Sequence, residues 1–207
     1  MTETEVMEWL KQNRPDIYYI KVASDNFLEK GNVRELGKIF SEANEYVQRD
    51  WIHDNTELRV VRNDDYTLSN NGLNYDLITS DGLLKIQCKL RFSKLHIEQT
   101  RRPTKNNSLN NRASSGYVRY AVGESDIYLF SRPKSIETYS DVKSWDIVAI
   151  PEHELWDKNN SGLLKVSVSE RVFKQYLGKT KETLERQYLL KNVLQYKNGV
   201  SYEKNRY

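Results

Sequence analysis

Three polar side chains whose types suit hydrolysis of an anionic substrate lie close together in the sequence: Asp76, Gln87 and Lys89. Hydrolysis of a phosphodiester needs a divalent cation, an activated water molecule and neutralisation of the charge that develops at phosphorus. The Asp76 carboxylate is a preferred ligand of hard cations, and the Gln87 amide offers the same ion a neutral oxygen. The Lys89 amine can orient or deprotonate the water, or stabilise the developing charge. The main-chain carbonyl of Cys88 is a further candidate metal ligand.

A predicted β-hairpin would bring these side chains together. Asp81-Gly82 divides two strand-like runs and is typical of a tight two-residue turn. With these two residues as the loop, Asp76 lies directly opposite Gln87, and their Cβ atoms are about 5 Å apart. Lys89 shares this face because side chains alternate along a strand. The other face is apolar and is expected to lie against a core; it carries Tyr75, Leu77, Leu84, Ile86, Cys88 and Leu90.

The same pattern has an ordinary structural interpretation, a solvated hairpin face, on which an aspartate and lysines are common. The charge of the following segment favours function. Eight basic residues lie between Lys89 and Arg119 against one acid, Glu98, although the whole chain carries a net charge of only +3. A basic stripe beside an otherwise acidic chain suits a polyanionic partner. It also lies next to the residues that would bind a metal.

The basic segment supplies the candidate contacts to nucleic acid. Its arginines and lysines suit phosphates, a contribution to affinity that falls steeply with salt. Arginine also suits guanine edges in the major groove, and asparagine suits adenine edges. A flexible solvated loop is the alternative for each of these residues. The candidate DNA-binding residues are Arg91, Arg101, Arg102, Lys105, Asn106, Asn107 and Arg112.

Length and composition indicate the number of domains and the cellular compartment. The 207 residues suit one domain that buries its own core. The single cysteine, Cys88, excludes an internal disulfide and indicates a reducing compartment; it is expected to be a small core residue rather than a nucleophile. The sequence contains no apolar run of ~20 residues and no signal-peptide core at its start. We therefore expect a cytoplasmic protein with no membrane partner.

The elements that must position these residues follow from hydrophobic periodicity. The strongest helix signal covers 33–51, and the tyrosines, Tyr120 among them, are expected in the core or at its rim. This order predicts a fold of the α/β class (α+β type), a mixed central sheet flanked by helices, with 1–207 forming a single domain, a catalytic core at about 33–150 and a C-terminal helical part at about 169–196. We expect further helices at 4–13, 169–177 and 180–196, and strands at 57–62, 125–130, 145–150 and 163–168.

The site pattern resembles that of the PD-(D/E)xK nuclease superfamily. The family signature is an acidic residue that opens one strand, followed by Glu-x-Lys on the next. Here Asp76 is followed after ten residues by Gln87-Cys88-Lys89. A long helix before the hairpin, then a crossover and the strand at Asp126–Phe130, match the family core over roughly 33–150. The resemblance implies a restriction-endonuclease-like fold.

The resemblance also implies an activity. It indicates a sequence-specific, double-stranded DNA endonuclease of the type II restriction class, dependent on Mg²⁺, for which Mn²⁺ can substitute, leaving 5′-phosphates and acting as a homodimer on palindromic sites. Gln87 replaces the usual second acid, as in some restriction enzymes of similar pattern, which removes one ligand charge. The family often supplies a further carboxylate from the preceding helix, and Glu42 is favoured here over Glu45. It further implies an intracellular protein of a bacterium, archaeon or virus that uses no nucleotide cofactor. The alternatives are a junction resolvase, a repair or homing nuclease, a catalytically inactive DNA-binding protein, or an RNA-directed protein.

Overall fold

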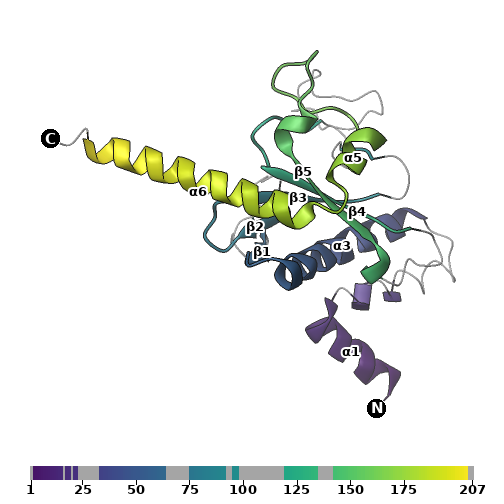
Figure 1. The fold of residues 1–207 in the computed structure, drawn as a ribbon. Helices are drawn as coiled ribbons and strands as arrows, with labels where there is room; N and C mark the ends of the chain where they lie inside the picture. The colour runs from purple at the N-terminus through teal and green to yellow at the C-terminus, as the bar shows by residue number, and fades with distance from the viewer. Residues whose placement is uncertain are drawn as a thin grey trace, which may run out of the picture.

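A computed structural model describes residues 2–15, 17–19, 21–22, 33–63, 75–91, 95–97, 119–134 and 142–204. Figure 1 shows its helices and strands. In chain order they are α1 (Glu3–Asn13), α3 (Val33–Asn55), β1 (Val60–Arg62), β2 (Leu77–Thr79), β3 (Lys85–Leu90), β4 (Ile127–Arg132), η2 (Val142–Ser144), β5 (Asp146–Pro151), η3 (Glu152–Leu155), α5 (Glu170–Tyr176) and α6 (Thr180–Lys204).

One mixed sheet organises the described residues. Its strand order is β1-β2-β3-β4-β5, and every neighbouring pair is antiparallel except β3 and β4. A parallel pair cannot be joined by a hairpin, so the chain must cross over between Leu90 and Ile127. The expected mixed sheet flanked by helices, with a crossover after the hairpin, is thereby confirmed.

Side chains alternate between two cores, one on each face of the sheet. The α3-side core consists of Ala43, Val47, Ile52, Leu58, Val60, Leu77, Leu84, Ile86, Cys88, Ile127, Leu129, Trp145, Ile147, Ala149 and Leu184. The α5-side core consists of Leu95, Ile97, Tyr120, Tyr128, Phe130, Val148, Ile150, Leu155, Leu164, Val168 and Phe173. Of the predicted apolar hairpin face, Leu77, Leu84, Ile86 and Cys88 lie in the α3-side core and Leu90 packs against it. Tyr75 is buried but belongs to neither core; its ring lies against Lys85 instead. The polar face with Gln87 and Lys89 lies on the α5 side.

Two predicted helices are confirmed at their starts. The Ser169 hydroxyl accepts the Val172 N–H at 3.3 Å, which is the cap expected at the start of α5. The helix expected over 180–196 begins at Thr180 but continues to Lys204. Of the described helices, none combines the length and the apolar character that crossing a membrane requires.

The strand expected at 163–168 is wrong. Leu163, Leu164 and Ser167 form only isolated bridges, to Ala121, Trp156 and His96 respectively. Because these partners come from three separate segments, no continuous ladder forms and the segment closes over the α5-side core instead. The strand expected at 57–62 is also shorter than predicted and covers only Val60–Arg62.

Candidate active site

The hairpin has the register that the sequence predicted. Leu77 pairs with Ile86 and Ile78 with Lys85, which is the predicted register. Asp76 lies one residue beyond this ladder, where its carboxylate accepts a hydrogen bond from the Gln87 side chain. Register decides which face each side chain occupies, since a slip of one residue would exchange the two faces. Asp76, Gln87 and Lys89 therefore lie together, as expected.

The turn itself differs from the predicted Asp81-Gly82 loop. The Gly82 N–H donates to the Thr79 carbonyl at 2.7 Å, so Ser80 and Asp81 are the central turn residues. Gly82 follows with φ +78°, a left-handed conformation that glycine adopts without strain. The Thr79 N–H still donates to the Leu84 carbonyl at 3.1 Å, and the loop therefore lengthens equally on both sides. This symmetry preserves the register although the turn is different.

Asp76 is held from two sides at the start of β2. Its main-chain N–H donates to the Ile86 carbonyl at 2.9 Å, and its carbonyl accepts the Asn63 N–H at 2.8 Å. Its carboxylate oxygen Oδ2 accepts the Cys88 N–H at 2.7 Å and a short hydrogen bond from Gln87 Nε2. The carboxylate is thus fixed against β3 rather than turned outward.

Gln87 leaves one strong acceptor unsatisfied. The residue is only 5% exposed, and its Nε2 donates to Asp76. Its Oε1 is buried and has no hydrogen-bond partner within the described part of the chain. A buried polar atom in this state costs about 1–3 kcal/mol, so such atoms ordinarily meet water, a ligand or an ion. An amide oxygen beside a carboxylate is a donor pair that a hard cation satisfies.

The Cys88 backbone faces the same edge. Backbone groups of successive residues in a strand point to opposite neighbours. The Lys85 carbonyl accepts the Asp126 N–H and the Arg91 N–H donates to the Ser131 carbonyl, both on the side of β4. The N–H and carbonyl of Cys88 therefore point to the other side, toward β2. Its N–H meets Asp76 there, and its carbonyl shares that side. Its thiol lies in the α3-side core, and burial raises the pKa of the thiol, with the charge of Asp76 adding to the effect. The expectation of a core cysteine is confirmed.

Lys89 is a buried amine. It is 6% exposed, and Nζ donates to the Tyr120 hydroxyl at 2.6 Å and lies 4.4 Å from the centre of that ring. Burial lowers the pKa of Lys89 to about 8, although the charge of Asp76 opposes the change. The amine therefore has an appreciable neutral fraction near physiological pH. The solvated hairpin face considered above is wrong, because Gln87 and Lys89 are both covered.

Tyr120 is a neighbour of Lys89 that sequence reasoning missed. It was expected only as core or rim, and it is indeed 6% exposed. Its ring packs edge to face on Tyr128, with centroids 5.6 Å apart, and its carbonyl accepts the Leu164 N–H at 2.9 Å. No sequence pattern relates Tyr120 to Lys89, because the basic segment separates them and the contact arises only in the folded chain.

The acidic helix residues are only partly described. Glu45 on α3 accepts a hydrogen bond from Arg62 Nε at 3.0 Å, and Arg62 Nη2 lies 2.9 Å from the same carboxylate in an ion pair that is mostly buried. The charge of Glu45 also acts on Lys89 and raises its pKa slightly against the effect of burial. Glu42 lies on α3, and its side chain is outside the described residues. Glu45 is therefore near the site but already occupied by Arg62.

Two further amide side chains reach the sheet from α3. Gln48 is fully buried, and its Nε2 donates to the Leu129 carbonyl at 2.9 Å and to Ser131 Oγ at 2.8 Å. Gln48 Oε1 and Asn44 Oδ1 are buried without a hydrogen-bond partner in the part of the chain that the structure describes. Because Ser131 pairs with Leu90, Gln48 lies under the same end of β3 as Lys89. Buried polar atoms of this kind are usual positions for ordered water.

Only one of the candidate DNA-binding residues lies among the described residues. Arg91 donates from Nε to the His96 carbonyl at 2.8 Å and from Nη1 to the Leu90 carbonyl at 2.7 Å. These bonds give it a structural role at the end of β3. The others, Arg101, Arg102, Lys105, Asn106, Asn107 and Arg112, lie outside the described residues.

The donor set suits a hard cation but contains one carboxylate. Asp76, the Gln87 amide oxygen and the Cys88 carbonyl are all oxygen donors, which fit an ion such as Mg²⁺ that retains several water ligands. No group of three or more His, Cys, Asp or Glu residues suited to a metal occurs in the described ranges. A metal centre with two carboxylates here would need one more, for which Glu42, Glu45 or a group of the substrate are the candidates.

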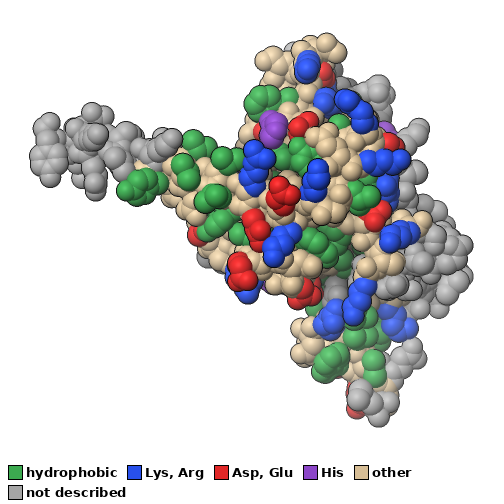
Figure 2. Space-filling model, viewed as in Figure 1, with side chains coloured by type: hydrophobic (Ala, Val, Ile, Leu, Met, Phe, Trp, Pro, Cys, Tyr) green, Lys and Arg blue, Asp and Glu red, His purple; other side chains and the backbone are tan. Residues whose placement is uncertain are grey.

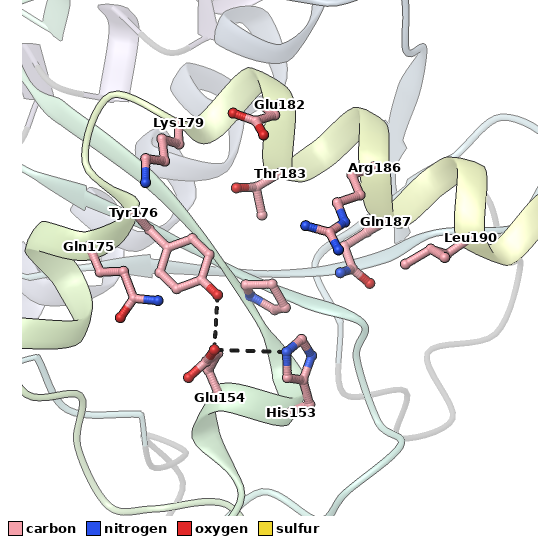
Figure 3. Close-up of a pocket in the computed structure, with 11 residues that line it drawn as sticks. His153, Glu154, Gln175, Tyr176, Lys179, Glu182, Thr183, Arg186, Gln187 and Leu190 are labelled. Atoms are coloured by element: carbon pink, nitrogen blue, oxygen red, sulfur yellow. Dashed lines mark hydrogen bonds and ion pairs between the residues drawn. The ribbon is translucent and has the colours of Figure 1, made fainter.

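A separate hollow of about 380 Å³ lies between η3, α5 and α6 (Figure 3). Tyr176 donates to Glu154 across it at 3.1 Å, and His153 lies 3.9 Å from the same carboxylate. It adjoins Pro151, which pairs with Ile127 at the start of β4, whereas Lys89 pairs with Phe130 near the end of β4. Its lining mixes cations and acids and includes none of the predicted site residues: Pro151, His153, Glu154, Gln175, Tyr176, Lys179, Glu182, Thr183, Arg186, Gln187 and Leu190.

Comparison with known proteins gives no match: no family model, no curated protein and no solved structure corresponds to this chain.

Proposed function

We propose that this protein is a metal-dependent, sequence-specific endonuclease of double-stranded DNA, a type II restriction enzyme with the PD-(D/E)xK arrangement. One observation carries the proposal. The buried Gln87 Oε1, which lacks a hydrogen-bond partner among the described residues, lies beside the Asp76 carboxylate on the face that also carries the buried amine of Lys89. A purely structural hairpin has no need for this combination.

Asp76, Gln87 and the Cys88 carbonyl are the proposed ligands of Mg²⁺, which Mn²⁺ can replace. Glu42 is the proposed second carboxylate, because α3 passes this end of the sheet and Glu45 is held by Arg62. When bound, the ion supplies charge neutralisation at the scissile phosphate and a more acidic water molecule. Gln87 now points Nε2 at Asp76, so its Oε1 would serve as a ligand beside Asp76 only with the amide turned over.

Lys89 is the proposed proton acceptor or electrostatic partner of the attacking water. With a pKa of about 8, its amine is partly neutral at the pH of the cell and can accept a proton. The water oxygen then bonds to phosphorus while the bond to the 3′ oxygen breaks. The leaving oxygen takes a proton from solvent, which leaves a 5′-phosphate and a 3′-hydroxyl. The Tyr120 hydroxyl holds Nζ in place for this role.

The basic segment between Lys89 and Arg119 supports the choice of DNA as substrate. Its charge suits the phosphate backbone, and its asparagines and arginines suit base edges. A restriction enzyme that cuts both strands of a palindromic site needs two such sites, for which a homodimer is the simplest arrangement.

One observation favours a second function, DNA binding without cleavage. The described site contains a single carboxylate, with Gln87 where the superfamily has an acid. A protein of that kind would shift DNA on a gel and leave it intact with Mg²⁺ or Mn²⁺.

Digestion of plasmid and phage DNA with and without Mg²⁺ separates these functions. Discrete bands that require Mg²⁺ are the expected result, and their ends should carry 5′-phosphates. A smear, or preference for branched DNA, would indicate a junction, repair or homing nuclease instead. Intact DNA with both metals, together with a gel shift, would contradict the proposed activity.

A further inference from the structure

The hollow between η3, α5 and α6 takes no part in the proposed cleavage. It has a volume of about 380 Å³ and adjoins Pro151, whereas Lys89 lies beside the other end of β4. Pockets that hold small organic ligands have volumes of about 300–1,000 Å³. The hollow is therefore large enough for a ligand of its own, and the side chains that line it indicate which kind.

One stripe of side chains along the start of α6 forms a wall of the hollow. Lys179 directly precedes the helix, and Thr183, Arg186 and Leu190 follow at steps of four, three and four residues. Side chains at this spacing lie on one side of a helix. The wall therefore presents a hydroxyl between two cationic side chains, with an apolar side chain at its far end.

Thr183 places a buried hydroxyl at the hollow. The residue is only 7% exposed, and Figure 3 shows its side chain pointing from α6 into the hollow. The hydroxyl makes no hydrogen bond to any of the residues that the structure describes. Buried hydroxyl groups almost always have a partner, because an unsatisfied one loses the free energy of its hydration. A water molecule or a ligand in the hollow is the partner that Thr183 can reach.

Lys179 and Arg186 bring positive charge to the same wall. Within the described ranges neither side chain forms an ion pair, unlike Lys181, which pairs with Glu185. Burial raises the pKa of the Tyr176 hydroxyl, and the charge of Arg186 opposes the change, so Arg186 acts across the hollow. The amino-terminal end of a helix carries a partial positive charge as well. An anion at this wall would meet two uncommitted cations and the positive end of α6.

The acids that line the hollow leave the cations of this wall uncompensated. Glu154, on η3, accepts the Tyr176 hydroxyl at 3.1 Å, and its carboxylate lies 3.9 Å from His153. Glu182 is exposed on α6 and forms no ion pair among the described residues. On the face shown in Figure 2, cationic and acidic side chains lie interspersed over the start of α6. An anion in the hollow therefore belongs against the α6 wall and away from the η3 side.

We propose that the hollow binds a small phosphorylated molecule, whose phosphate lies against Lys179, Thr183 and Arg186. Three donor side chains match the three terminal oxygens of a phosphate monoester, whereas a carboxylate has only two. Arginine binds such oxygens in pairs, and lysine supplies a point charge. A phosphate group fills only part of the hollow. The remaining space adjoins the Tyr176 ring and Leu190, which suit the carbon-containing part of the ligand.

Calorimetric titration of the full chain in buffer with EDTA tests this site. Adenosine 5′-monophosphate and ribose 5-phosphate represent a nucleotide and a sugar phosphate, and binding of either supports the proposal. The ester that binds should do so about tenfold more tightly than inorganic phosphate and than its own phosphate-free form, adenosine or ribose. No binding of either ester, or equal affinity for inorganic phosphate or for the phosphate-free form, would overturn the proposal.

Matched variants assign the binding to the hollow. Arg186→Gln removes a cation from the wall and should weaken binding about tenfold. Lys181→Gln removes a cation that pairs with Glu185 and does not line the hollow, so the affinity should stay unchanged. Thr183→Val removes the hydroxyl, keeps the shape of the side chain and should weaken binding about fivefold. The Tm of each variant without ligand checks that it is folded.

Unchanged affinity in Arg186→Gln, or equal losses in Arg186→Gln and Lys181→Gln, would overturn the assignment of this site. Because the titrations contain neither DNA nor a divalent cation, failure of this site and failure of the nuclease assignment remain distinguishable.

Discussion

The Lys89 ammonium donates a hydrogen bond of 2.6 Å to the Tyr120 hydroxyl, although 31 residues separate the two in the sequence. Tyr120 is itself fixed by its edge-to-face contact with Tyr128 and by the Leu164 N–H. The buried amine is therefore held by a residue that lies directly after the basic segment. Any ligand that moves this segment would also act on the position of Lys89.

Loss of the Tyr120 hydroxyl should lower stability through Lys89. Tyr120→Phe leaves a buried amine without this acceptor, and hydrogen bonds to charged groups are worth about 1.5–3 kcal/mol. Urea unfolding of the wild type, Tyr120→Phe, Lys89→Met and the double variant measures the coupling. We expect Tyr120→Phe to cost little in the Lys89→Met background. Equal costs in both backgrounds would show that the two side chains do not interact.

The burial of Lys89 should make stability depend on pH in the alkaline range. The pKa of its amine falls from 10.5 to about 8 on folding, so between these values the unfolded chain binds more protons than the folded chain. The free energy of unfolding therefore rises with pH from about 8 to 10.5, by on the order of 3 kcal/mol from this group. Lys89→Met should lack this increase when both proteins are unfolded across pH 7.5–10.5. Parallel pH curves would contradict a depressed pKa.

A second carboxylate at Gln87 should make folding respond to Mg²⁺. Gln87→Glu places a carboxylate against Asp76, which removes the short hydrogen bond and adds repulsion in metal-free buffer. Bound Mg²⁺ should reverse this loss, so that the rise in Tm on adding Mg²⁺ is larger than in the wild type. Gln175→Glu, on an exposed position of α5, controls for added charge. Equal Mg²⁺ responses in Gln87→Glu and the control would exclude Gln87 from a metal site.

Substitutions of Glu42 and Glu45 on α3 should change different properties: cleavage for Glu42 and stability for Glu45. Glu45→Gln deprives the largely buried Arg62 of its carboxylate and should destabilise the fold by roughly 2–3 kcal/mol. Glu42→Gln should instead lower Mg²⁺-dependent cleavage at least tenfold with an unchanged unfolding midpoint. Urea unfolding and cleavage assays on the same two variant proteins measure the free energy of unfolding and the cleavage rate. A stable but inactive Glu45→Gln would transfer the metal role to Glu45.

The sequence predicted the parts of the fold that depend on local patterning. Alternation along the hairpin was enough to place Gln87 and Lys89 on one face and Leu77 and Ile86 on the other. It also predicted the start of α5 from the capping chemistry of Ser169. These features depend on neighbouring residues alone, which is why they could be read in advance.

Long-range relationships could not be read in this way. Lys89 contacts Tyr120, which was assigned only to the core or its rim, and the segment at 163–168, assigned to a strand, closes over the same α5-side core. The burial that lowers the pKa of Lys89 therefore had no local signal. The turn at Ser80-Asp81 also differs from the prediction; one of the hydrogen bonds that hold Asp81 comes from Tyr188 on α6, far away in the sequence.

Cleavage by a matched pair of lysine variants tests the central claim most directly. Lys89→Met and Lys85→Met each remove one amine from the same face of β3, but Lys85 lies four residues earlier and is partly exposed. Both proteins would be incubated with plasmid DNA and Mg²⁺, and binding measured separately in Ca²⁺. We predict that Lys89→Met still binds DNA but cleaves at least 100-fold more slowly, while Lys85→Met cleaves like the wild type. Undiminished cleavage by Lys89→Met would contradict the assignment of the site.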